Sequence, residues 1–455
     1  MDIHSVLAKF IQASIKKALQ GTHVGCEEII LLAPKLKEHG DISTNIAMRL
    51  AGLMRMRPLD IAEKITAQMQ KCIVDTSLRG KIAKISVKEP GFINFFLTNF
   101  ALVDSLEKIQ ADREKYGSCN SGKGKMVLIE FVSANPTGPL SVAHGRQAAV
   151  GDSLVNILRF SGWQATSEYF INDEGRQINM LGESIRLRYL EKLGQTIDFP
   201  QDGYKGRYIY DMAQDIIKRY GKKYASPTKA TIDFFRGYGC EHIMNIIKGE
   251  LKDFDVHFDV WTSQARLVRA KKIEKVFAKL KKKGFLYEHE GALWFKSTAF
   301  GDDKDRVVIK SDGSYTYLAP DIAYHLDKFK RGFDKLINIW GPDHHGYIPR
   351  LKAAVQALGY PKEVIDVLIV QLATLYRGKE QVPMSTRSGE FITLRQVMED
   401  VGKDAARFFF VARKASSHLD FDIELAKKQS QENPVYYVQY AHARCSNIIE
   451  FAKKS

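Results

Sequence analysis

The stretch MVLIEFVSANPTGPLSVAHGR, residues 126–146, decides the fold class of this chain. Its opening run is apolar apart from Glu130, which is typical of a strand buried on both faces of a parallel sheet. A loop of small residues and prolines follows, and apolar residues then recur at helical spacing between Val150 and Leu158. Strand, loop and helix in this order predict the first half of a βαβ unit.

The same alternation of strands and helices recurs further along the chain. We expect a strand over 164–172 and a helix over 176–193, and two later apolar runs flank a helix over 348–358. Between these parts, the residues of about 195–290 are mostly helical in pattern and strongly basic, and they predict a connective insertion. The predicted fold class is therefore α/β, with a Rossmann-type parallel sheet and an inserted connective domain.

Two further regions flank this predicted sheet. Helical spacing followed by the strand-rich segment ISVKEPGFINFFL predicts an N-terminal α+β domain over residues 1–110. The Rossmann-type catalytic domain is then expected over 120–395. The remaining residues, 396–455, are helical in pattern.

Bulk composition favours a globular protein with reduced thiols. Hydrophobic residues make up 45% and charged residues 27% of the chain, which excludes the disordered and collagen-like classes. The formal charge of +15 suits a polyanionic partner such as nucleic acid, although a basic surface without such a partner gives the same value. Five scattered cysteines without a CxxC pair, and no apolar segment of membrane length, predict a soluble cytoplasmic protein without a zinc site or disulfides.

The loop after the first predicted strand lies where doubly wound sheets bind their ligands. Its small residues allow the backbone to approach a nucleotide, amides near Gly145 and Arg146 can face phosphate oxygens, and His144 can donate a hydrogen bond. The loop is neither G-x-G-x-x-G nor a P-loop. The alternative interpretation is structural, with Pro136 and Pro139 rigidifying a tight crossover and His144 capping the helix.

Three other places carry polar groups suited to the same crevice. Tyr317 and Asp321 lie one helical turn apart, where a phenol and a carboxylate can bind a guanidinium or an ammonium group. Alternatively, Asp321 caps a helix and Tyr317 is a core residue. The adjacent His344 and His345 follow an apolar strand and could suggest a metal site. We discount that interpretation, because neighbouring histidines seldom ligate a metal together without a supporting set of carboxylates or cysteines, and adenosine contacts fit a strand-end loop as well. Arg387 can reach a phosphate or can belong to an ordinary surface loop.

Taken together and in this order, the motifs resemble those of arginyl-tRNA synthetases, which are class I aminoacyl-tRNA synthetases. The blocks that carry the resemblance extend over essentially the whole chain and include PGFINFF, EFVSANPTGPLSVAHGR, EYFINDEGRQI, GDDKDRVVIKSDGSYTYLAPDIAYH, WGPDHHGYIPRLKAA, MSTRSGEFITL and VGKDAARFFF. The resemblance implies a Rossmann catalytic domain with a connective insertion, and an N-terminal domain that touches the tRNA elbow. It also implies a helical anticodon-binding domain that begins after about residue 395 and is truncated at Ser455, from which we expect weak tRNA binding.

The activity implied by the resemblance is an arginine-tRNA ligase. L-arginine and ATP, with Mg²⁺, form arginyl-adenylate, and the arginyl group is then esterified to the terminal adenosine of tRNA(Arg). Bound tRNA is generally needed for the first step in this family. We expect no tightly bound metal and no membrane partner, and we expect a monomer. The alternatives are a catalytically weakened, truncated RNA-binding relative and, less favoured, a small-molecule nucleotidyltransferase of the same fold.

The resemblance also assigns roles to individual residues. The arginine-binding positions match Glu130, Asn135, Tyr317 and Asp321. The ATP-binding positions match Pro136, Gly138, Ala143, His144, Gly145, Asp343, His344, His345, Gly346 and Met384. The catalytic positions of the family's HIGH and KMSKS motifs match His144, Ser141, Arg387 and Ser385.

Both of these catalytic motifs depart from their usual form. Ser141 and Ala143 replace the first histidine and the glycine of HIGH, so a cationic donor is lost and a methyl group stands where an adenine normally approaches bare backbone. Pro383 and Thr386 replace the two lysines of KMSKS, which removes two cationic contacts to the triphosphate. We expect activity to persist, with Arg387, Lys379 or Mg²⁺ compensating for the missing charges.

Overall fold

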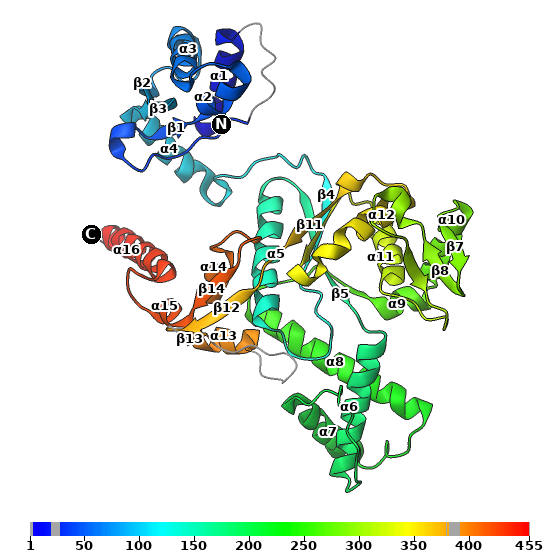
Figure 1. The fold of residues 1–455 in the computed structure, drawn as a ribbon. Helices are drawn as coiled ribbons and strands as arrows, with labels where there is room; N and C mark the ends of the chain where they lie inside the picture. The colour runs from blue at the N-terminus through cyan, green and yellow to red at the C-terminus, as the bar shows by residue number, and fades with distance from the viewer. Residues whose placement is uncertain (1–2, 20–27, 379, 382–391, 455) are drawn as a thin grey trace. The chain divides into compact units, whose positions relative to one another are not determined.

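The computed structural model of the protein describes residues 3–19, 28–378, 380–381 and 392–454. The chain divides into two compact units, Met1–Ser118 and Cys119–Ser455 (Figure 1). Each unit has a hydrophobic core of its own.

The first unit is an α+β domain. Its helices are α1 Ile3–Ala18, α2 Ile46–Met54, α3 Pro58–Cys72 and α4 Asn99–Asp112, and its strands are β1 Ile42–Thr44, β2 Ile82–Lys88 and β3 Phe92–Leu97. The strands form an antiparallel sheet in the order β1-β3-β2. Leu7 of α1, Ile61 of α3 and Phe95 of β3 are fully buried in one core, so the helices pack on one face of this sheet.

The second unit is built on a five-stranded parallel sheet in the order β11-β10-β4-β5-β6. The strands are β4 Met126–Glu130, β5 Gln164–Ile171, β6 Val260–Ser263, β10 Lys335–Trp340 and β11 Ile365–Ile369. The expected Rossmann-type arrangement is confirmed. From β4, the next strands in the chain, β5 and β6, are added on one side of the sheet, and β10 and β11 are added on the other side. This reversal beside β4 is the switch point where sheets of this kind bind ligands.

The apolar run of β4 is continuous because helices cover both of its faces. Val127 and Ile129 pack in the core that contains α5 Val142–Phe160, whereas Leu128 packs with residues of α11 Leu318–Lys330 and α12 Ile348–Leu358. Alternate side chains of a strand point to opposite faces, so each face receives apolar residues. Figure 1 shows α11 and α12 lying side by side, and they are in contact.

Other helices and two small sheets complete the second unit. The helices are α6 Arg176–Lys192, α7 Arg207–Tyr220, α8 Lys229–Asp253, α9 Gln264–Arg269, α10 Lys272–Lys282, α13 Leu394–Val401, α14 Lys403–Val411, α15 Ile423–Lys427 and α16 Pro434–Lys454. The small sheets contain β7 Leu286–His289, β8 Ala292–Phe295 and β9 Arg306–Ile309, and β12 Ala373–Arg377, β13 Glu380–Gln381 and β14 Leu419–Asp422. No helix in the described part of the chain is long and apolar enough to cross a bilayer.

Two short strands lie where the sequence predicted helix or insertion. Val260–Ser263 falls inside the predicted insertion of 195–290, yet it pairs with β5 as the edge strand of the main sheet. Leu419–Asp422 falls inside the predicted helical region of 396–455, yet it pairs in parallel with β12. Both strands have only four residues, and the edge strand is half-buried throughout, so neither shows the apolar pattern of a central strand.

Candidate active site

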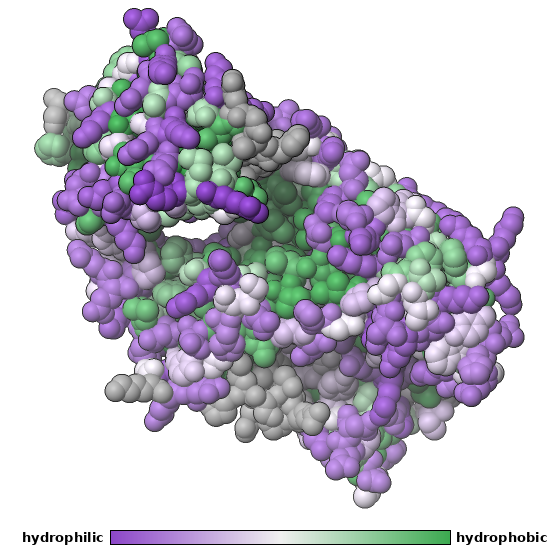
Figure 2. Space-filling model, turned by 45° about the horizontal axis from the view of Figure 1, so that its top comes forward, coloured by the Kyte–Doolittle hydropathy of each residue, from purple (hydrophilic) through white to green (hydrophobic). Residues whose placement is uncertain are grey.

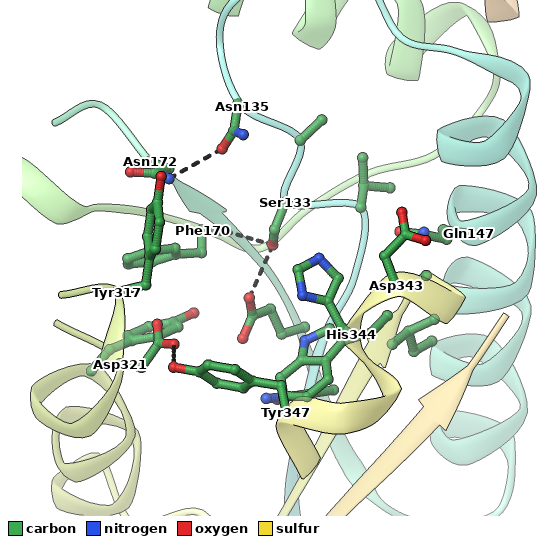
Figure 3. Close-up of a pocket in the computed structure, with 18 of the residues that line it drawn as sticks. Ser133, Asn135, Gln147, Phe170, Asn172, Tyr317, Asp321, Asp343, His344 and Tyr347 are labelled. Atoms are coloured by element: carbon green, nitrogen blue, oxygen red, sulfur yellow. Dashed lines mark hydrogen bonds between the residues drawn. The ribbon is translucent and has the colours of Figure 1, made fainter. Parts of the chain in front are cut away.

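A pocket of about 760 Å³ opens at the carboxyl ends of β4 and β10, at the switch point of the sheet. Most of its lining comes from the loop after β4, the start of α5, the end of β5, the start of α11, and the segment from the end of β10 into α12. Further lining residues come from the start of α9, from β9 and from the segment after β11. Figure 3 shows Tyr317 and Asp321 on one side of the pocket and Gln147 and Asp343 on the other.

Asp321 lies in the first turn of α11 and receives a hydrogen bond at the pocket wall. The Tyr347 hydroxyl donates to Asp321 Oδ2 at 2.5 Å (Figure 3). Burial raises the pKa of Asp321 to about 6, and the negative charge of Glu130 adds to this effect, whereas the bond from Tyr347 and the charge of Lys328 oppose it. Tyr317 is 69% exposed and lines the same pocket, so the alternative interpretation of Tyr317 as a core residue is wrong.

Glu130 ends β4 at the floor of the pocket and is buried as an ion pair. Lys328 Nζ lies 2.5 Å from Glu130 Oε2, and the Ser133 hydroxyl donates to Glu130 Oε1 at 3.1 Å. Glu130 retains 7% of its exposure and lines the pocket, whereas Lys328 is completely buried. The ammonium of Lys328 therefore compensates the negative charge of Glu130 from the protein interior, and the carboxylate stays accessible from the cavity.

The loop after β4 is held by hydrogen bonds to the end of β5. The Phe170 amide donates to Ser133 Oγ at 3.1 Å, and the Asn172 side chain donates to Asn135 Oδ1 at 3.1 Å. Val132 and Ser133 have φ angles of 64° and 40°. This left-handed backbone is strained for a β-branched residue and turns the chain sharply from the strand toward the pocket. Asn135 is thereby fixed at the pocket wall.

His144 both closes the first turn of α5 and lines the pocket. Its Nδ1 accepts a hydrogen bond from the Ser141 backbone amide at 3.2 Å and lies 3.1 Å from Ser141 Oγ. Burial lowers the pKa of His144 to about 4, so the ring is neutral near pH 7. Because Nδ1 accepts, the hydrogen-bond network assigns the ring proton to Nε2. The capping and the ligand-binding interpretations of this histidine are thus compatible.

The segment after β10 forms the 3₁₀-helix Pro342–Tyr347, and the two adjacent histidines within it lie in different surroundings. Residues three apart lie above one another in a 3₁₀-helix, and His344 and Tyr347 both line the pocket, as does Asp343. His345 is exposed and is not part of the pocket wall. Gly346 lines a neighbouring, shallower cavity instead.

Other residues assigned to ATP lie away from the described pocket wall. Pro136 and Gly138 are not among its lining residues, and Gly138 sits against the Tyr208 ring. Gly145 faces the opposite way, because a Cβ there would lie 2.7 Å from the Leu394 side chain. The absence of a side chain at Gly145 allows the close contact of α5 with α13 and α14.

The side chain of Arg146 is turned into the protein. Its fully buried guanidinium donates to the backbone carbonyls of Gln371, Leu372, Phe410, Lys414 and Ser417. Met384, Ser385 and Arg387, together with Lys379, Pro383 and Thr386, lie outside the described residues.

Sequence reasoning missed several polar groups at this site, namely Gln147, His325, Lys328, Asn338 and Tyr347. A signal for three of them was present. Asp321, His325 and Lys328 follow one another at spacings of four and three, which places them on one face of a helix that is otherwise apolar there. Asn338 is a lone polar residue inside the apolar run LINIW. No comparable pattern indicates Tyr347.

Within the described ranges, no group of three or more His, Cys, Asp or Glu side chains is arranged to hold a metal ion. The pocket instead has the Asp321 carboxylate on one side, and the neutral His144 and the Asp343 carboxylate line it elsewhere.

Comparison with known proteins identifies the class of the second unit. Residues 105–429 match the sequence profile described as tRNA synthetases class I (R), catalytic domain. A parallel sheet with its pocket at the switch point is the expected framework for such a domain. The second unit thus contains the catalytic domain of a class I aminoacyl-tRNA synthetase.

The remaining comparisons narrow this class to one family. Residues 6–97 match the profile of the arginyl tRNA synthetase N terminal domain. The chain is 50% identical over 449 residues to arginine-tRNA ligase 1 of Halalkalibacterium halodurans, covering 98% of this chain and 80% of that protein. It is also 50% identical over 428 residues to arginine-tRNA ligase of Geobacillus kaustophilus, covering 94% and 76%. The chain belongs to the arginyl-tRNA synthetases.

A solved structure has the same fold at much lower sequence identity. The Thermus thermophilus arginyl-tRNA synthetase superimposes with a TM-score of 0.73 at 21% identity, covering 99% of this chain and 82% of that chain.

Proposed function

We propose that this chain activates L-arginine with ATP and transfers the arginyl group to the terminal adenosine of tRNA(Arg). The observation that carries the proposal is the buried Asp321 carboxylate beside the pocket of a family member, with Tyr317 next to it. An ionised carboxylate accepts paired hydrogen bonds from a planar guanidinium, whereas the ammonium of lysine presents only a point charge. This difference supplies selectivity for arginine.

The other end of arginine carries an ammonium group, and we propose that Glu130 and Asn135 receive it. Both residues line the pocket, and each is held by a neighbour: Glu130 by Ser133 and Lys328, and Asn135 by Asn172. A substrate held at both ends has its carboxylate in a defined direction, which is the main requirement for attack on the α-phosphorus of ATP.

ATP is assigned to the side of the pocket formed by α5 and the segment after β10. The neutral His144 can donate its Nε2 proton to a phosphate oxygen, and Asp343, His344 and Ala143 line the wall around it. In the reaction, the arginine carboxylate oxygen bonds to the α-phosphorus while pyrophosphate leaves. A hydroxyl of the tRNA's terminal adenosine then attacks the arginyl carbonyl and AMP leaves.

We propose that Mg²⁺ arrives with the phosphates of ATP rather than in a protein cage. The described residues contain no ready-made metal cluster, and Mg²⁺ commonly combines one or two carboxylates with substrate phosphates. When bound, the ion would neutralise charge that develops on the phosphates. The replaced lysines of the KMSKS counterpart make this contribution more important.

We also propose a monomer that works in the cytoplasm. Cys72, Cys119, Cys240 and Cys445 are free thiols, as is usual in a reducing compartment.

The test is ATP-pyrophosphate exchange with and without tRNA(Arg), using arginine and lysine as alternative substrates. We expect exchange that requires arginine and increases strongly with tRNA(Arg), together with charging of the tRNA. Absence of arginine-dependent exchange in the presence of cognate tRNA would contradict the proposal. RNA binding without binding of arginine or ATP would favour the non-catalytic alternative.

A further inference from the structure

Lys328 is a fully buried ammonium group beneath the floor of the pocket, and no step above uses it directly. Burial of an unpaired charge is costly, so its surroundings must compensate it. Its Nζ lies 2.5 Å from Glu130 Oε2, 3.2 Å from Asn338 Oδ1, and 4.2 Å from the centre of the Tyr324 ring. Three different groups thus hold this one ammonium.

The hydrogen bonds continue from Lys328 to the backbone of Asp321. The Asn338 side-chain nitrogen lies 3.0 Å from His325 Nε2, and His325 Nδ1 lies 2.8 Å from the Asp321 carbonyl oxygen. A carbonyl can only accept, so His325 carries its proton on Nδ1, and its Nε2 accepts from the Asn338 amide. Asn338 Oδ1 is then free to accept from Lys328, so each hydrogen bond in this series joins one donor to one acceptor.

The residues that form this series of hydrogen bonds are buried, so the geometry of the series is fixed. Asn338 is fully buried and His325 retains 2% of its exposure. Burial and the charge of Lys328 keep the pKa of His325 well below its ordinary value, so His325 stays neutral. The network begins at Glu130, which is assigned to the ammonium end of arginine. It ends at the backbone of Asp321, whose side chain is assigned to the guanidinium end.

We infer that Lys328 is a positioning residue for arginine recognition, which orients the Glu130 carboxylate and ties it to the turn that carries Asp321. The inference rests on the proposed function, because it takes Glu130 and Asp321 as the two ends of the arginine site. Without Lys328, the buried Glu130 carboxylate retains only the Ser133 hydroxyl as a side-chain partner, so its direction toward the cavity is no longer fixed. A carboxylate that is not held in place forms a weaker hydrogen bond with the substrate ammonium.

The test is calorimetric titration of L-arginine into the full chain at pH 8, without ATP or tRNA. Lys328→Met keeps the length of the side chain and removes its charge, and we expect arginine affinity to fall by about tenfold or more, as for the loss of one charged hydrogen bond. The matched control is Lys272→Met, which removes an ion pair with Asp327 on the same helix but outside the pocket. Affinity should stay within about twofold of the wild type in this control. Wild-type affinity in a folded Lys328→Met variant would overturn the inference.

A double-mutant cycle separates positioning from general packing. Lys328 acts through Glu130 in our proposal, so Glu130→Gln and the double variant Glu130→Gln/Lys328→Met should bind arginine equally weakly at pH 8. Additive losses, or an affinity unchanged by Glu130→Gln, would contradict it. The double variant carries no unpaired buried charge, so it remains informative if Lys328→Met alone does not fold.

The pH dependence supplies a readout that a purely structural role would not produce. The charge of Lys328 lowers the pKa of Asp321, while Glu130 raises it and the hydrogen bond from Tyr347 lowers it. In Lys328→Met, arginine affinity should therefore fall more between pH 8 and pH 6 than in the wild type. Equal pH dependence in both proteins would contradict this part of the inference.

Failure of this inference is distinguishable from failure of the proposed function. A wild-type chain that binds arginine but does not charge tRNA(Arg) contradicts the ligase proposal alone. Normal charging together with wild-type arginine affinity in Lys328→Met contradicts the positioning role alone.

Discussion

At the scale of single residues, Asp321 carries a charge that the fold by itself disfavours. Its pKa is about 6 instead of the ordinary 3.8, mainly because the group is buried. The ionised form therefore lowers stability above about pH 6, and this penalty disappears below pH 3.8, where the group is protonated in both states. A binding site for a cation accounts for such a residue, because a bound guanidinium offsets the cost.

Asp321→Asn should weaken arginine binding and stabilise the empty protein at the same time. The amide keeps a hydrogen-bond acceptor for Tyr347 but loses the charge, so we expect the KM for arginine to rise by about 100-fold and the KM for ATP to change little. The thermal midpoint at pH 8 should increase. Exchange kinetics with each substrate varied in turn, and calorimetry, provide the measurements.

The same carboxylate predicts the acid limb of the wild-type profile. The kcat/KM for arginine should fall as the pH drops through about 6, because protonated Asp321 no longer pairs with the guanidinium. In Asp321→Asn this limb should be absent. Equal increases in both KM values, or an unchanged limb, would contradict the assignment.

We propose that His144 acts at the nucleotide side as a neutral donor. Its pKa of about 4 leaves the ring uncharged over the working range, so it can orient a phosphate oxygen without titrating. Ser141 stands at the position where the family usually has a histidine, and its backbone amide and its hydroxyl both contact Nδ1 of His144. The unusual HIGH counterpart thus retains one oriented imidazole.

His144→Ala should lower the exchange rate by about 100-fold or more at saturating arginine, because a preorganised donor to the reacting phosphates is lost. The KM for arginine should change much less. His257→Ala is a suitable control, because the His257 side chain is 72% exposed and its ion-pair partner is Asp255. Unchanged exchange in His144→Ala would remove this residue from the mechanism.

At the scale of elements, α5 is placed by glycines and by a buried arginine. A Cβ at Gly151 would lie 2.3 Å from the Phe131 ring, and one at Gly145 would meet the Leu394 side chain. Arg146 ties the helix to three separate segments through their carbonyl groups. These contacts explain why this helix begins directly at the pocket and holds His144 there.

Gly151→Ala should destabilise the second unit by about 1–3 kcal/mol, since the added methyl group forces Phe131 to move in a close-packed core. Gly249→Ala in α8 is the matched control, because no atom lies within 4 Å of the position of its Cβ. Alanine has the higher helix propensity, so this variant should gain about 0.5–1 kcal/mol. Calorimetric unfolding measures both changes, and equal stability of the two variants would contradict the packing account.

At the scale of the whole molecule, charge is the property that bears on the macromolecular partner. The formal charge is +15, and hydrophilic residues dominate the visible surface in Figure 2. A basic surface attracts the phosphates of nucleic acid and releases their counterions on binding. The proposed tRNA partner is consistent with this charge.

Affinity for tRNA(Arg) should therefore fall linearly on a plot of log K against log salt, with a slope set by the number of neutralised phosphates. Arginine affinity measured without tRNA should vary much less over the same range of salt. Fluorescence titration of labelled tRNA from 50 to 200 mM salt, on the order of the range over which such effects are large, supplies the test. A slope near zero would contradict an electrostatic interface.

The sequence by itself determined the order of elements and the family. Strand periodicity, turn residues and caps are local properties, so the runs of β4, β5, β10 and β11 and the helices between them follow from nearby residues. The two short strands β6 and β14 were not predicted, because their pairing depends on a distant partner rather than on their own pattern. The spacing of Tyr317 and Asp321 was readable for the same local reason.

Only the tertiary structure decided which polar groups meet. Tyr347 reaches Asp321 from 26 positions away, and Lys328 reaches Glu130 from 198 positions away. The structure also turns Gly145 toward α13, although the sequence suggested the nucleotide. Such contacts depend on the parallel order of the strands and on close packing between helices, and neither is encoded in the spacing of neighbouring residues.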